Sequence, residues 1–273
     1  MNKKLLVSLV VVAVSVAAGM FSLIAYASHS WGGYHWSRTV NPFNLKLGDN
    51  VSTWDSYLST TSGDWSVSTV LDTEVVPGNT NALKGKNTPK NCVPTSGRVE
   101  VCNSKYGNNG WLGVASIWVS GGHITQGTVK VNDTYFNTAR YNTPAWRNLV
   151  MCQEVGHTLG LDHQNETYDT PNLGTCMDYT SDPDGTINGW LSNEHPNQHD
   201  YDQLETIYAH LETAFTGVFG KKFPAPVTAD DIDTSNPSEW GKVIRKSGDG
   251  RSSLHERDMG NGRKLFTFVI WAN

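Results

Sequence analysis

Apolar and polar residues alternate over several short stretches of the chain, and this period of two predicts β-strands. Four stretches in the first half show it: 31–47, which Pro42 interrupts, 67–76, 111–119 and 123–131. Ser120-Gly121-Gly122 joins the last two, which predicts a hairpin. Residues 79–110 are rich in Asn, Gly, Lys and Thr, so we expect a long surface region there, with one hairpin arm at 98–102.

At three other places the apolar residues recur every three to four positions, which predicts amphipathic helices. These are 51–60, 144–159 and 197–211. Thr143-Pro144 supplies an N-cap and a first-turn proline for the second helix, and Gly160 is a suitable residue to end it. A last apolar stretch, 263–271, predicts a strand. This order predicts an α+β protein whose sheet forms early and whose chemistry lies late in the chain.

The first 27 residues have the organisation of a signal peptide. Lys3 and Lys4 precede an uncharged run from 5 to 27, which ends in Ala25-Tyr26-Ala27. Signal peptidase cuts after such small residues, so Ser28 is the expected first mature residue. The alternative is an uncleaved anchor, because the run is long enough to span a bilayer. In both cases we expect the remaining chain outside the cytoplasm, and we favour a secreted, extracellular protein.

Composition and charge exclude several classes of protein. The net charge is −5 and no basic run is present, so we expect no nucleic-acid partner. No second stretch could cross a membrane, so we expect no membrane contact after signal cleavage. The fractions of 38% hydrophobic and 17% charged residues exclude a chain that is disordered throughout. The ten Trp are scattered, which favours core positions over a polysaccharide-binding surface.

Four cysteines in an exported chain indicate two disulfides with three possible connectivities. They are Cys92, Cys102, Cys152 and Cys176. Cys92 and Cys102 flank one polar loop, which favours a bridge between them.

One segment, 153–163, carries the candidate chemistry. Gln153 and His157 are four residues apart and project from one face of a helix, with Glu154 beside them. Gly160 allows a sharp turn, after which His163 can return to the same place. The segment therefore offers two or three metal ligands and a carboxylate that can accept a proton.

This segment resembles the signature H-E-x-x-H-x-x-G-x-x-H of metzincin metallopeptidases, with Gln153 in place of the first His. The family also has a Met-turn, and Cys176-Met177-Asp178-Tyr179 resembles one. The resemblance, to the matrixin-like and gametolysin-like members, covers about residues 31–215. It implies an α+β catalytic domain over 28–215, with a mixed twisted sheet, an active-site helix, a Met-turn and a C-terminal helix. The extension 216–273 is expected to pack on this domain.

The resemblance also implies a role for each matching residue. Gln153, His157 and His163 would be metal ligands, and Glu154 the general base. Met177 would form an apolar floor beneath the metal, with Gly160 as the structural turn. Tyr179 would stabilise the oxyanion.

Two further features of the family bear on substrate and on the second disulfide. The strand 113–119 would be the edge strand that pairs with an extended peptide substrate. Because the Met-turn passes under the active-site helix, a Cys152–Cys176 bridge is favoured. The catalytic pattern starts almost at the mature N-terminus, so we expect no zymogen stage.

The Gln at the first ligand position leaves two outcomes open. The side chain of Gln153 reaches as far as that of a His, but a neutral amide oxygen is usually a poorer zinc ligand. The site could hold Zn²⁺, or copper, and hydrolyse peptides, as is inferred for algal relatives of gametolysin that share this Gln. Otherwise it is a weakened metal site on a catalytically silent binding protein. The presence of Glu154 favours the first outcome.

Several other residues have a structural and a functional interpretation. Asp182-Pro183-Asp184-Gly185 could bind Ca²⁺, but a turn is the favoured interpretation. The stretch 197–200, with His199 and Asp200, is expected to cap the following helix and support the Met-turn. His35, His123 and His195 have no ligand spacing and are expected to be structural or surface residues.

The sequence thus predicts a secreted, monomeric, zinc-dependent metalloendopeptidase that hydrolyses protein or peptide substrates with a metal-activated water.

Overall fold

The computed structural model describes residues 29–81, 88–168, 170–212 and 232–272, so the expected signal peptide lies outside the described residues. The strands are β1 (His35–Trp36), β2 (Phe43–Asn50), β3 (Leu71–Pro77), β4 (Val99–Ser104), β5 (Trp111–Ser120), β6 (His123–Asn132), β7 (Lys242–Lys246), β8 (Ser252–Gly260) and β9 (Arg263–Trp271). The helices are α2 (Asp55–Trp65), α3 (Asp133–Phe136), α4 (Pro144–Thr158) and α5 (Gln198–Ile207), with short 3₁₀ turns at Asn79–Asn81 and Pro237–Glu239. The protein is therefore of the α+β class.

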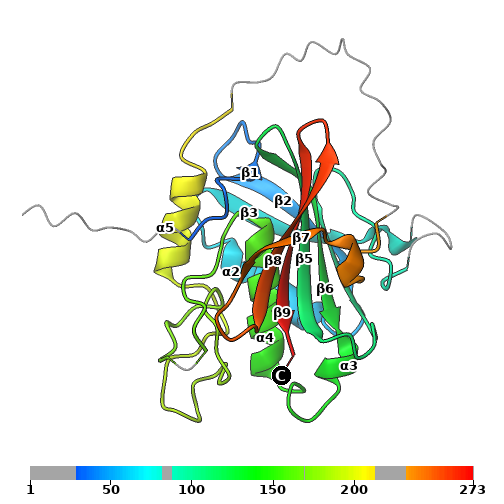
Figure 1. The fold of residues 1–273 in the computed structure, drawn as a ribbon. Helices are drawn as coiled ribbons and strands as arrows, with labels where there is room; N and C mark the ends of the chain where they lie inside the picture. The colour runs from blue at the N-terminus through cyan, green and yellow to red at the C-terminus, as the bar shows by residue number, and fades with distance from the viewer. Residues whose placement is uncertain (1–28, 82–87, 169, 213–231, 273) are drawn as a thin grey trace, which may run out of the picture.

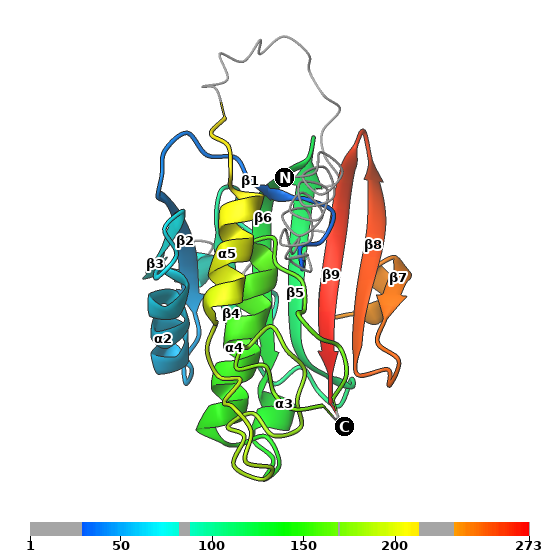
Figure 2. The same cartoon turned by 90° about the vertical axis from the view of Figure 1, so that its left-hand side faces the viewer.

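The strands form one mixed sheet in the order β3-β2-β4-β6-β5-β9-β8-β7, with β1 pairing on β6. The pairs β2–β3, β2–β4 and β4–β6 are parallel, whereas β5–β6, β5–β9, β8–β9 and β7–β8 are antiparallel. Figure 2 shows the sheet continuing past β5 into β9, β8 and β7. The antiparallel half of the sheet is thus built largely from the end of the chain.

The hairpin of β5 and β6 confirms the pairing expected from the Ser-Gly-Gly turn. The expected hairpin arm at 98–102 is wrong, because β4 is an interior strand that pairs in parallel with β2 and β6. Because β4 contains several polar residues, its sequence does not look like that of a buried strand. Glu100 is fully buried, and its carboxylate accepts hydrogen bonds from Arg98 and Asn50.

Two expectations about the sheet are corrected by β9. The sheet does not form only from the early chain, because β7, β8 and β9 complete it. The strand 113–119 is not an edge strand either, because β5 pairs with β6 on one side and with β9 on the other. The predicted boundary between residues 215 and 216 lies outside the described residues, but β7, β8 and β9, which follow it, belong to the same sheet.

Helix α4 lies along one face of the sheet and packs on β5, β6, β9 and α2 (Figure 1). Its start is as predicted: the side chain of Thr143 accepts a hydrogen bond from the Trp146 backbone at 3.2 Å, and Pro144 follows. All its residues except Pro144 and Asn148 are buried. A helix buried on nearly every side is held by packing rather than by helix propensity.

Most of the Trp residues belong to the core, as the sequence favoured. Eight of the ten are buried, and Trp54, Trp65, Trp111 and Trp240 are completely inaccessible. Burial of these rings leaves little aromatic surface for a polysaccharide. Within the described residues, no helix is long and apolar enough to span a membrane.

Disulfides join Cys92 to Cys102 and Cys152 to Cys176, the two pairs that the sequence favoured. The first links β4 to the loop that precedes it. The second links α4 to the segment that carries Met177, so the two parts of the candidate signature are covalently connected.

Lys130 is a buried cation on β6. It has no exposed surface, and its Nζ donates a hydrogen bond to Ser235 Oγ at 2.8 Å. Burial lowers its pKa from 10.5 to about 8, although the nearby Asp233 opposes the shift. An unfolded chain keeps the ordinary pKa, so between pH 8 and 10.5 it binds more protons than the folded protein at this site.

We therefore expect the free energy of unfolding to rise by up to about 3 kcal/mol between pH 8 and 10.5 on account of Lys130. Lys130→Met should remove this rise, whereas Lys46→Met, at an exposed position of β2, should keep it. Denaturant unfolding of both variants at the two pH values measures the difference. The same pH dependence in both variants would show that Lys130 is not the cause.

Candidate metal centre

Helix α4 places Gln153 and His157 on one face, and both side chains are buried. The Nε2 of Gln153 donates a hydrogen bond to the Cys176 carbonyl at 2.9 Å, which directs the amide oxygen the other way. Burial lowers the pKa of His157 well below its usual value, and the neighbouring His163 lowers it further. His157 is therefore a neutral imidazole, which is the form that binds metals.

The turn after α4 brings His163 back to His157, as the sequence predicted. Gly160 has a φ of +102°, and a Cβ there would lie 2.7 Å from the Tyr34 carbonyl oxygen, so the position requires glycine. The rings of His157 and His163 lie 4.5 Å apart and nearly perpendicular. The sharp turn thus gathers two imidazoles from positions six residues apart.

In both imidazoles an oxygen acceptor lies beside Nδ1. The Nδ1 of His157 is 3.0 Å from the Leu161 carbonyl oxygen, and that of His163 is 3.3 Å from Glu166 Oε1. Since these oxygens accept, each Nδ1 carries a proton, and Nε2 is the nitrogen of each ring that is left for another partner. This is the usual arrangement behind a histidine that ligates a metal through Nε2.

Three buried polar atoms of the signature have no hydrogen-bond partner among the described residues: Gln153 Oε1, Glu154 Oε2 and His163 Nε2. Buried polar atoms are rarely left unpaired, and an ion or water is a common explanation. With the imidazole of His157 added, the donors are two imidazole nitrogens and the amide oxygen of Gln153, which suit zinc or copper better than magnesium. The residues present therefore fit a metal ion of that kind.

Glu154 lies against β5. Burial raises the pKa of its carboxyl well above the usual value, and only a hydrogen bond from the Ala115 backbone opposes this. A Cβ at Gly113 would lie 2.6 Å from Glu154 Oε1, so a glycine is needed for the strand to pass this close. The sequence analysis missed Gly113, because a single glycine in a strand gives no sign of what approaches it.

Met177 lies under α4, where the floor of the site was expected. A Cβ at Gly156 would lie 2.6 Å from Met177 Sδ, so this glycine lets the sulfur approach the helix. Tyr179 is buried as well, and its ring centroid lies 4.3 Å from that of His163.

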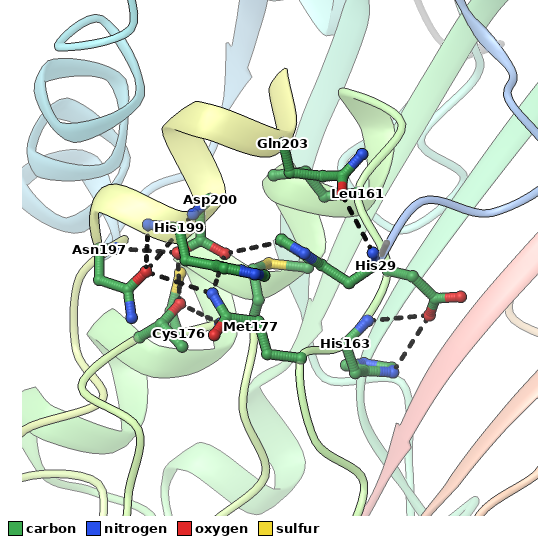
Figure 3. A network of polar contacts seen from close by, with 12 residues as sticks. His29, Leu161, His163, Cys176, Met177, Asn197, His199, Asp200 and Gln203 are labelled. Atoms are coloured by element: carbon green, nitrogen blue, oxygen red, sulfur yellow. Dashed lines mark hydrogen bonds and ion pairs between the residues drawn. The ribbon is translucent and has the colours of Figure 1, made fainter. Parts of the chain in front are cut away.

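Asp200 supports this turn from α5, as Figure 3 shows. Its carboxylate accepts a hydrogen bond from Thr175 Oγ1 at 2.5 Å, and Thr175 in turn accepts one from the Met177 backbone. His29 Nε2 lies 3.1 Å from the same carboxylate. Asn197 and Asp200 also form a capping box at the start of α5. The predicted capping and supporting role of 197–200 is therefore confirmed.

The loop with Asp182 and Asp184 contains a turn, as the sequence favoured. Asp182 accepts hydrogen bonds from Asn188, and Asp184 accepts two from Thr186. The backbone of Gly185 donates to the Asp182 carbonyl at 3.0 Å. These carboxylates thus stabilise their own loop.

Two residues from the C-terminal strands reach the signature, and sequence reasoning missed both. The guanidinium of Arg245, on β7, holds both carboxylate oxygens of Asp162 and lies 3.2 Å from Glu166 Oε1. Burial alone would raise the pKa of Asp162, but the hydrogen bonds from Arg245 lower it. An ion pair therefore holds the segment before and after His163 to β7.

Phe268, on β9, is the second residue. Its ring stacks on that of His157, with centroids 4.0 Å apart and planes 13° from parallel. Gln153, Glu154, His157 and Tyr179 are each at most 1% exposed. The candidate centre is thus closed to solvent in this conformation, and β9 occupies the side of β5 that was expected to receive a substrate.

The structure therefore brings Gln153, Glu154, His157, His163, Met177 and Tyr179 together, with the Cys152–Cys176 disulfide beside them. The Cys92–Cys102 disulfide belongs to β4 and contributes nothing to this cluster.

No family model matches the sequence, and no curated protein matches it either. A search of solved structures finds a similarity to high choriolytic enzyme 1, a hatching enzyme zinc-protease from the medaka fish Oryzias latipes. The TM-score is 0.35 and the sequence identity 10%, over 66% of this chain and 96% of that one.

Proposed function

We propose that this chain is a secreted, metal-dependent endopeptidase, with Gln153, His157 and His163 as its metal ligands. The observation that carries the proposal is the set of buried, unpartnered polar atoms on Gln153, Glu154 and His163. Zinc is the favoured ion and copper the alternative, since both accept imidazole. The two disulfides support an exported chain, because such bonds persist in oxidising compartments.

A bound zinc ion would polarise the substrate carbonyl and lower the pKa of water at the site. Glu154 would move the proton, because the positive charge of the ion would favour its ionised form against the effect of burial. Its Oε2 would take the proton from the attacking water and return it to the leaving amine. His157 and His163 can each offer Nε2 to the ion, because their Nδ1 atoms donate to the Leu161 carbonyl and to Glu166. Tyr179, beside His163, would donate a hydrogen bond to the oxyanion.

A catalytically silent binding protein on the same fold is the second candidate. The covering of His157 by Phe268 is the observation that favours it. The peptidase proposal requires β9 to move away from β5 before a protein substrate can enter, whereas a silent protein requires no such motion.

Gln153→His separates the two candidates. We expect the wild type to hold one more metal ion per chain than His163→Ala, and to cleave casein until a chelator removes that ion. Imidazole is a better zinc ligand than an amide oxygen. The chelator concentration that inactivates the Gln153→His variant should therefore be about 10–100-fold higher than the concentration that inactivates the wild type. Elemental analysis and cleavage assays along a chelator series measure both quantities.

A different outcome would support the silent protein. If the wild type holds no metal at this site and cleaves nothing, while Gln153→His gains both properties, then Gln153 has silenced the centre. If neither protein binds metal or cleaves casein, the peptidase proposal fails outright.

A further inference from the structure

A second group of potential metal ligands lies at the end of the sheet where β1 pairs with β6. His35 lies opposite His123 in this parallel pair, although 88 positions separate them in the sequence. His210 and Glu212 follow α5, whose end lies close to β1 in Figure 2. The backbone N–H of Glu212 donates to the Arg38 carbonyl at 2.8 Å, which fixes this segment beside β1.

The three imidazoles converge on one carboxylate oxygen, Oε1 of Glu212. The Nε2 atoms of His123, His210 and His35 lie 2.9, 3.2 and 3.6 Å from Glu212 Oε1. One ligand atom from each of His35, His123 and Glu212 lies within 4.8 Å of the other two. In a tetrahedral zinc site with bonds of about 2.0–2.1 Å, neighbouring ligand atoms are about 3.3 Å apart. The contacts of His123 and His210 with Glu212 Oε1 are close to this spacing, and the ligand atoms of His35, His123 and Glu212 lie near enough to one another to close around one ion.

The proton positions on His35 point to a cation as well. Its Nδ1 lies 2.9 Å from the Gly33 carbonyl oxygen, which can only accept, so Nδ1 carries a proton and Nε2 is the nitrogen left for an ion. This buried Nε2 faces Glu212 Oε1 at 3.6 Å, which is longer than a hydrogen bond, and it has no hydrogen-bond partner among the described residues. An ion between the two atoms would bind both.

We propose that His35, His123, His210 and Glu212 form a second metal site, which binds a divalent ion of the zinc type. Three imidazoles and one carboxylate favour zinc or copper and disfavour calcium and magnesium. The side chain of His210 is 58% exposed and that of His35 14%, so the site is open to ions from solvent on one side.

Four protein ligands make this a structural centre rather than a catalytic one. It joins β1, the first residue of β6 and the segment after α5. These parts are distant in sequence, so the ion would fix the chain on both sides of α4 and α5 relative to the sheet. We therefore expect zinc to stabilise the fold without taking part in the chemistry at α4.

The test is a zinc count on the full chain and on two variants, Glu212→Gln and His123→Ala. We expect each variant to hold one zinc ion per chain fewer than the wild type after equilibration with zinc and removal of the free ion. The affinity of this site for zinc should fall at least about tenfold. Even the loss of a residue that only orients a metal ligand lowers metal affinity by about 10–100-fold. Zinc should raise the Tm of the wild type by about 4 °C or more and that of the variants by less.

His195→Ala is the matched control, because His195 forms a partly exposed pair with a single carboxylate, Asp64, at 2.7 Å. It should keep the wild-type zinc count. Melting without zinc checks that Glu212→Gln folds, and its isosteric side chain makes a folding defect easy to separate from a binding defect. Equal zinc counts in the wild type, Glu212→Gln and His123→Ala would overturn the proposal. If the wild type holds one zinc ion per chain in total and Glu212→Gln holds none, the proposal is supported even though the α4 centre binds no ion.

Discussion

Replacing Glu154 by Gln is expected to lower the rate of casein cleavage by about 10²–10⁴-fold, the contribution typical of a positioned general base. Gln has nearly the same shape as Glu and can still accept a hydrogen bond from the Ala115 backbone, but its amide cannot take a proton at neutral pH. Gln153, His157 and His163 are untouched, so the metal content should stay at the wild-type value. The comparison of cleavage with metal content therefore isolates proton transfer from ion binding.

Glu205→Gln is the matched control, because Glu205 is an exposed residue of α5 whose carboxylate bonds only to Thr69 among the described residues. It should cleave like the wild type. If Glu154→Gln retains full activity, Glu154 is not the base and the proposed chemistry is wrong. If Glu154→Gln loses its metal together with its activity, the carboxylate is a ligand rather than a proton carrier.

The local part of the candidate site could be predicted from the sequence because it depends on short-range geometry. The spacing of Gln153 and His157 fixes a shared helix face, and Gly160 permits the turn that returns His163. The predicted N-cap at Thr143 and the final strand at 263–271 are also properties of local sequence. The structure contains each of these features where the sequence placed them.

The pairing of distant strands could not be predicted in the same way. The apolar run 263–271 identified β9 but not its neighbour, because a strand buried on both faces can pair with any open edge. The contacts of Phe268 with His157 and of Arg245 with Asp162 depend on that pairing. The family resemblance implied a peptide substrate on β5, and the structure places β9 there.

The histidines at β1 and β6 illustrate the same limit. His35 and His123 lack any ligand spacing, so the sequence favoured structural or surface roles for them. Their proximity comes from the parallel pairing of β1 with β6, which no local pattern encodes. Zinc sites assembled from distant strands are therefore found from coordinates rather than from motifs.

Strand β9 covers the α4 centre, so a covalent link between β9 and β5 is expected to abolish peptide cleavage. Ser116 and Thr267 lie directly opposite each other on these strands, and both are fully buried. Neither hydroxyl has a hydrogen-bond partner among the described residues, so their replacement removes no polar contact. Side chains opposite each other in antiparallel strands lie about 4.5–5.5 Å apart at Cβ, which is close enough for a disulfide after a small adjustment.

In the double variant Ser116→Cys/Thr267→Cys, the oxidised form should cleave casein at least about 100-fold more slowly than the reduced form, because the cross-link removes the open population. Thr267 precedes Phe268 and faces the other side of the sheet, so the lock leaves the ring stacked on His157 in place. The single variant Ser116→Cys and the wild type, given the same redox treatment, control for effects on the two native disulfides. Equal cleavage by the oxidised and reduced double variant would mean that substrate reaches Glu154 without displacing β9, and the entry route would then have to lie elsewhere.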